Sequence, residues 1–119
     1  MKYCLSDSEQ LIMDILWAHE QWMTIVELSA ELEKRGISWK RQTINTFLSR
    51  LIKKDMVVQS SRKYAYAHTA KEYESLRARE YLSSEYGGSL KKFIAALSGD
   101  QELAAEDAGA LLQYLEQFK

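Results

Sequence analysis

The stretch "SWKRQTINTFLSRLIKK" (residues 38–54) carries five basic residues and no acidic one, in a chain whose formal net charge is −1. Its apolar residues recur at i, i+3, i+4, i+7 and i+8, at positions Ile44, Phe47, Leu48, Leu51 and Ile52. That spacing predicts an amphipathic helix with one broad apolar face. At 100° per residue, its opposite face is polar and basic: Gln42, Thr46, Ser49 and Lys53, flanked by Asn45 and Arg50.

The surrounding segment extends this charge bias. Residues 34–63 contain nine basic residues, and Asp55 is their only acid. A solvated surface that happens to be basic would have the same composition, so charge alone does not identify a binding face. The order and spacing of the neighbouring elements are needed to distinguish a binding face from a solvated basic surface.

Two helices are predicted before this stretch and a β-hairpin after it. Ser6-x-x-Glu9 and Thr24-x-x-Glu27 are capping boxes, and each precedes apolar residues at helical spacing. Gly36 suits the end of the second helix. In "MVVQSSRKYAYAH" (residues 56–68), two short β-prone runs flank a basic turn, which predicts a hairpin.

Three helices followed by a hairpin with a basic tip is the order of a winged helix-turn-helix. The sequence therefore predicts a mainly α fold with a small β-hairpin wing: a winged-helix DNA-binding domain at residues 1–70 and a C-terminal helical region at residues 71–119. The apolar residues of the second region have no obvious partner within the chain. A second copy of the same region is the simplest candidate to bury them, so the region is predicted to form a dimer. The predicted dimerisation residues are Tyr73, Leu76, Leu90, Phe93, Ile94, Leu97, Leu111, Leu112, Leu115 and Phe118.

The polar face of the third helix has the chemistry that double-stranded DNA requires. Short polar side chains suit base edges in the major groove, and cations suit phosphates. The predicted base-reading residues are Gln42, Asn45, Thr46 and Ser49. The predicted phosphate contacts are Arg41, Arg50, Lys53, Arg62 and Lys63. The alternative is an amphipathic helix whose polar face is exposed to solvent and binds nothing, and the pattern favours DNA binding over this alternative.

Three segments resemble the penicillinase-repressor family of bacterial winged-helix transcriptional repressors: "LSDSEQLIMDILW", "TINTFLSRLIKKDMV" and "RKYAYAHTAKEYESL". The resemblance covers nearly the whole chain. It implies a homodimeric repressor that binds a palindromic operator through the winged helix. It also implies that Thr43, Thr46 and Arg50 lie in the recognition helix, and that Arg62 lies in the wing.

The sequence departs from the family pattern at four places, one of which is His68, where the family usually has a proline after the wing. Lys40 and Arg41 stand where the family often has Ser-Pro, which adds charge and removes a good N-cap. Copper-responsive members end in Cys-x-Cys pairs, which this chain lacks. Antibiotic-responsive members are cut by a membrane sensor protease at an Asn-Phe bond, and the aligned pair here is Ala96-Leu97. The resemblance alone therefore leaves that partner open.

Other functional classes find no support in the sequence. Cys4 is the single cysteine, and His19 and His68 have no paired ligands, so no metal site and no cofactor are expected. No catalytic constellation stands out, so no enzyme is expected. No apolar run approaches the roughly 20 residues of a membrane span, and a cytoplasmic protein is expected. Trp17, Trp22 and Trp39 are expected in the core or at helix junctions. A winged-helix module that binds another protein remains the alternative function.

Overall fold

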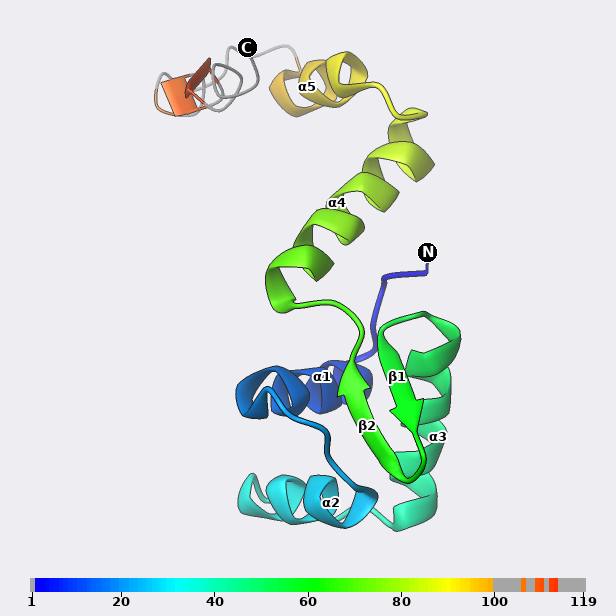
Figure 1. Ribbon diagram of the computed structural model, residues 1–119. Helices are drawn as coiled ribbons and strands as arrows, with labels where there is room; N and C mark the ends of the chain where they lie inside the picture. The colour runs from blue at the N-terminus through cyan, green and yellow to red at the C-terminus, as the bar shows by residue number, and fades with distance from the viewer. Residues whose placement is uncertain (1, 100–105, 107–108, 111, 114–119) are drawn as a thin grey trace. The chain divides into compact units, whose positions relative to one another are not determined.

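The computed structural model describes residues 2–99, 106, 109–110 and 112–113. The named elements within these residues are α1 (Asp7–His19), α2 (Ile25–Lys34), α3 (Arg41–Lys53), β1 (Val57–Ser60), β2 (Lys63–Tyr66), α4 (Ala70–Tyr86) and α5 (Leu90–Ser98). This is the predicted mainly helical fold with one small hairpin (Figure 1).

Both predicted capping boxes form. The hydroxyl oxygens of Ser6 and Thr24 accept the backbone N–H of Glu9 and Glu27, each at 3.2 Å. The two carboxylates accept the backbone N–H of Ser6 and Thr24 in return, at 3.0 and 3.1 Å. Each box satisfies amides that the first turn of a helix leaves unpaired, which fixes where α1 and α2 begin.

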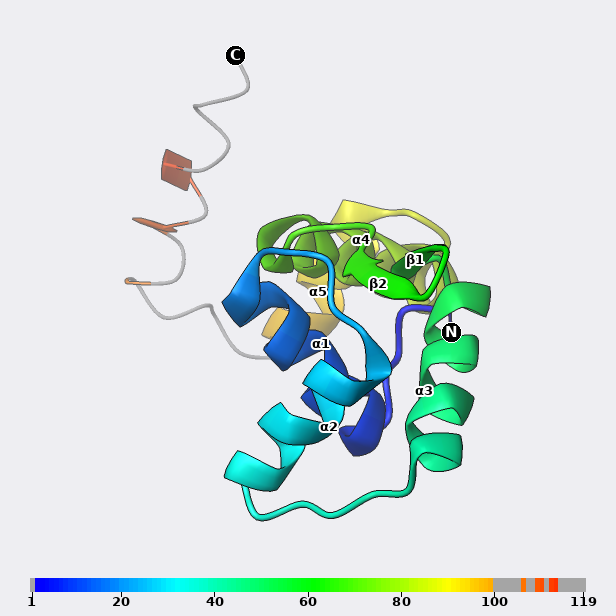
Figure 2. The same cartoon turned by 60° about the horizontal axis from the view of Figure 1, so that its bottom comes forward.

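The core lies where α1, α2 and α3 meet, and the hairpin packs over it (Figures 1 and 2). β1 and β2 are antiparallel with Val57 opposite Tyr66, and Met23 adds a single bridge to Tyr64. The largest fully buried side chains are Ile12, Met13, Ile15, Leu16, Met23, Leu28, Leu32, Ile44, Leu48, Leu51 and Met56. The apolar face of α3 is thus anchored, and its polar face is left outside.

A largely buried ion pair fastens α3 to α1. Glu9 is 3% exposed, and Lys54 Nζ lies 3.0 Å from its Oε1 and 2.9 Å from its Oε2. Burial raises the pKa of Glu9, but hydrogen bonds from Lys54 and Ser6 outweigh that effect, so the net pKa is lower than usual. The pair holds the C-terminal end of α3 against the start of α1.

The chain divides into two compact units, residues 1–80 and 81–119. α4 crosses the division, because Tyr73 belongs to the first core: it is 5% exposed and its ring centroid lies 5.6 Å from that of Trp17. Tyr73 is therefore covered mainly by its own subunit, and its role in dimerisation stays a prediction. The assignment of functional regions to residues 1–70 and 71–119 stays a prediction.

The three tryptophans have different environments. Trp17 donates its Nε1–H to the carbonyl oxygen of His68 at 2.9 Å, and Trp39 lies 5.2 Å from Phe47 between ring centroids. Both pack against the core as expected. Trp22 lies at the junction between α1 and α2, as expected, but it is 44% exposed and is not part of the core. The adjacent bridge between Met23 and Tyr64 turns Met23 inward instead, because neighbouring residues of an extended segment point to opposite sides.

Candidate nucleic-acid interface

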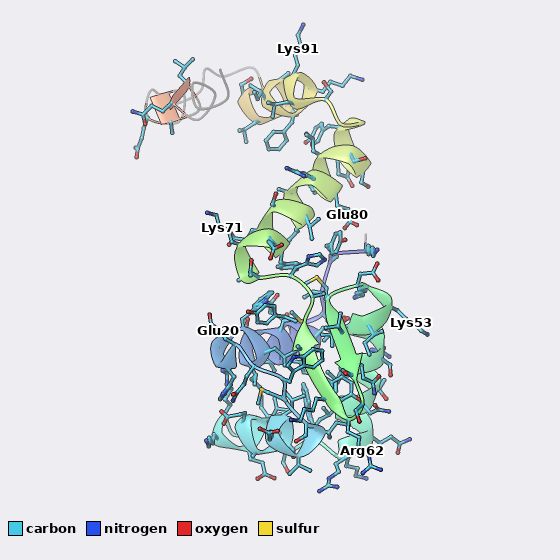
Figure 3. The ribbon with its side chains drawn as sticks, in the orientation of Figure 1. Glu20, Lys53, Arg62, Lys71, Glu80 and Lys91 are labelled. Carbon is cyan, nitrogen blue, oxygen red and sulfur yellow. The ribbon has the colours of Figure 1, made fainter. Side chains whose placement is uncertain are left out.

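The polar face of α3 is exposed along the length of the helix. Thr43 is half-buried, and the remaining predicted DNA contacts of α3 are exposed: Arg41, Gln42, Asn45, Thr46, Ser49, Arg50 and Lys53. Figure 3 shows Arg62 at the tip of the hairpin and Lys53 at the C-terminal end of α3. The structure therefore brings the predicted contacts of α3 and of the hairpin together on the first unit.

The cations of this face make no ion pairs within the described part of the chain. Among the described residues, none of the predicted phosphate contacts lies within ion-pair distance of a carboxylate; Lys2, His19, Lys34 and Lys54 make the ion pairs instead. Because α3 also has no acid in its first turn, the positive end of its dipole adds to the charge of Arg41. The face is therefore a site of positive potential that suits a polyanion.

Two side chains of α3 are held in defined orientations. The hydroxyl of Thr46 donates to the carbonyl oxygen of Gln42 at 2.9 Å, which commits its proton to the helix. The guanidinium of Arg50 lies 5.5 Å from the ring centroid of Phe47, and Phe47 in turn packs against Trp39. A cation over an aromatic face gains attraction while its N–H groups still point to solvent. Thr46 is thus suited to offer its methyl group, and Arg50 is pre-positioned.

The N-terminal end of α3 shares a surface hollow with the hairpin. Its volume is about 420 Å³, and it is lined by Thr24, Ile25, Val26, Arg41, Gln59, Arg62 and Tyr64. Arg41 and Arg62, predicted separately from the helix and the wing, therefore line one site. Val26 and Gln59 were not predicted. Val26 is 55% exposed at the start of α2, and an apolar residue that interrupts the polar side of a helix was the signal available for it.

The second unit carries most of the remaining predicted dimerisation residues. α5 has no buried residue, and Leu90 and Leu97 are 46% and 65% exposed. Phe93 and Ile94 are half-buried. The rings of Tyr86 and Phe93 pack edge-on, with 5.4 Å between their centroids. Leu112 is 62% exposed, and Leu76 is half-buried on α4. Leu111, Leu115 and Phe118 lie outside the described residues.

Known proteins resemble this chain over nearly its whole length. The sequence matches the penicillinase-repressor family over residues 5–117. The chain belongs to this family. It is 29% identical over 119 residues to the penicillinase repressor of Bacillus licheniformis, covering 97% of this chain and 91% of that protein. It is also 29% identical over 104 residues to the penicillinase repressor of Staphylococcus aureus, covering 83% and 80%.

Membership of the penicillinase-repressor family supports a role as a transcriptional repressor, and members of the family are regulators rather than enzymes. In the part of the chain that the structure describes, no three His, Cys, Asp or Glu side chains cluster as a metal site would require. Within the same residues, no helix has the length and apolar character needed to cross a membrane.

Proposed function

We propose that this protein is a homodimeric repressor that binds a palindromic operator in the cytoplasm. The observation that carries the proposal is α3, whose apolar face is buried in the core and whose polar face is exposed, free of acid and without ion-pair partners among the described residues. Such a helix presents donors, acceptors and cations at the width of a major groove.

Within this proposal the contacts divide by chemistry. Gln42 and Asn45 suit bidentate contacts with adenine, Ser49 suits either hydrogen-bonding role, and the Thr46 methyl suits the methyl group of thymine. The cations at the two ends of α3 position the helix on phosphates but do not read sequence. The hollow lined by Arg41 and Arg62 suits the flanking backbone, because its guanidinium groups match a phosphate and its apolar wall matches a deoxyribose.

The exposed apolar residues of the second unit supply the proposed dimer contact. Leu90, Leu97 and Leu112 are large side chains left open to solvent, and a second copy of the same surface would cover them. Two-fold symmetry would then place two α3 helices on one face of the duplex, with half-sites separated by a multiple of about 10 base pairs.

Release from DNA is proposed to follow cleavage within residues 93–100, by a membrane sensor protease of the kind that acts on antibiotic-responsive members. The Ala96-Leu97 bond lies in α5, a short helix without a buried residue, which can open at low cost to enter a protease. The bond is not Asn-Phe, so the specificity would differ. Mass spectrometry of the chain from derepressed cells tests this, and an intact chain would exclude it. Copper is expected to leave operator binding unchanged.

Selection of bound sequences from a random duplex pool tests the main proposal. A homodimer with one α3 per half-site should enrich an inverted repeat. Enrichment of a single unrepeated site would contradict the dimeric arrangement. Absence of any enrichment, together with no duplex binding at low salt, would favour the protein-interaction alternative.

A further inference from the structure

The segment before α1 lies between the end of α3 and α4 (Figure 1). The two carboxylate oxygens of Glu80 each accept one backbone N–H of this segment: Oε2 accepts that of Lys2 and Oε1 accepts that of Tyr3, both at 2.9 Å. Residues 77 or more positions apart in sequence are thereby joined. We call residues 2–5 the N-terminal strap.

The strap is also fastened to the winged-helix core. The hydroxyl of Tyr73 donates to the carbonyl oxygen of Tyr3 at 2.8 Å. At the C-terminal end of α3, Lys54 Nζ donates to the carbonyl oxygen of Cys4 at 3.1 Å, and the Lys2 ammonium pairs with Asp55. Figure 2 shows the chain start beside that end of α3. The strap thus bridges the recognition helix and α4.

α4 depends on this bridge for its direction. Tyr73 is its one buried residue, and α4 packs only weakly against the other named helices and strands, so packing alone does little to fix its direction. Glu80 lies about two turns further along, on the same face of the helix as Tyr73. A second attachment at that distance fixes an axis, because two points on a rigid helix determine its direction (Figure 3).

We infer that Glu80 is a positioning residue that sets the half-site spacing of the operator by holding α4 to the strap. The inference rests on the proposed dimer. α4 continues past Glu80 into the second unit, so the direction in which it leaves the first unit bears on how far apart the two α3 helices lie in a dimer. The strap also contacts Lys54 and Asp55 at the C-terminal end of α3. These contacts therefore link the direction of α4 to the position of α3.

Amide hydrogen exchange of the full-length protein tests the contact itself. Residues near a chain end ordinarily exchange without protection. The Lys2 and Tyr3 amides should be protected in the wild type and should exchange at least about tenfold faster in Glu80→Ala. Alanine keeps the helix propensity of α4. Glu74→Ala is the matched control, since Glu74 is exposed on the same helix and makes no side-chain hydrogen bond among the described residues. Unprotected wild-type amides would overturn the inference.

A series of selected operators with different spacers tests the consequence. Wild-type affinity should fall by about tenfold or more when the spacer changes by two base pairs, because the second half-site moves out of reach. The double variant Tyr73→Phe, Glu80→Ala should lose most of that dependence while it binds a single half-site as the wild type does. An unchanged spacing dependence in this variant would overturn the inference about Glu80 and would leave the proposed function standing. Failure of the wild type to bind any duplex as a dimer would instead contradict the proposed function.

Discussion

At the scale of single residues, the recognition face mixes two kinds of contact that substitution can separate. Asn45 and Thr46 lie mid-helix, where base edges are within reach, whereas Lys53 lies in the last turn of α3. The Thr46 hydroxyl donates its proton to Gln42, so its methyl group and the acceptor lone pairs of its oxygen remain for a base. Base contacts specify sequence, and phosphate contacts only add affinity.

Asn45→Ala and Thr46→Ala are therefore expected to relax base preference at one position each, at a cost of about 1–3 kcal/mol for the preferred base. Lys53→Ala is expected to weaken all duplexes equally and to reduce the salt dependence by about one phosphate contact per subunit. Titration against operators with single base changes measures both. A uniform loss for all three variants would show that the roles are assigned wrongly.

Glu9 is a residue whose charge contributes to stability. Its pKa is lowered in the folded protein, because hydrogen bonds from Lys54 and Ser6 outweigh the effect of burial. The stabilisation is therefore complete above the ordinary glutamate pKa of about 4.3 and is lost as the pH falls through the lower folded value.

Glu9→Gln is expected to reduce the free energy of unfolding by about 2 kcal/mol at pH 7, between the values typical of exposed and fully buried pairs. The difference from wild type should shrink below about pH 4. Urea unfolding at both pH values measures this. Glutamine can still complete the capping box, so the helix start is preserved. A difference independent of pH would contradict the role of the charge.

At the scale of elements, α3 begins without a side-chain cap, since Lys40 occupies the N-cap position and makes no capping hydrogen bond. Lys40→Ser should raise the free energy of unfolding by about 1 kcal/mol, because a serine hydroxyl can accept an N–H of the first turn. Thermal or urea unfolding measures the gain, with Lys40→Ala as the control that removes the charge without adding a cap. Equal stability of the two variants would show that the position needs no cap.

The elements themselves were largely predictable, because they depend on local signals. Two capping boxes predict where two helices begin, and they are formed by Ser6 with Glu9 and by Thr24 with Glu27. The hairpin follows from an alternating pattern of residues around a basic turn. The burial of Tyr73 in its own subunit was not predicted, because periodicity shows that a side chain has an apolar face to cover, not which surface covers it. The hollow and the strap join residues distant in sequence, and no local pattern encodes such contacts.

At the scale of the whole molecule, the burial of Tyr73 changes where the chain can be cut. Residues 1–80 are expected to form a folded monomer that binds operator DNA weakly, because the linked second half-site is lost. Residues 1–70 lack Tyr73, which leaves Trp17 and Tyr3 uncovered, so this shorter fragment should unfold more readily. Sedimentation and thermal unfolding of both fragments measure this. A tight dimer formed by residues 1–80 would contradict the proposed place of the dimer contact.

The salt dependence of affinity for the selected duplex tests the central claim most directly. If Arg41, Arg50, Lys53, Arg62 and Lys63 of both subunits contact phosphates, the slope of log affinity against log salt should be about −9, because each neutralised phosphate releases its counterion, and a slope of about −5 or steeper supports the claim. Affinity should then fall by about a thousandfold or more between roughly 50 and 200 mM salt. A slope near zero, or no duplex binding at the lower salt, would contradict DNA binding through the exposed face of α3.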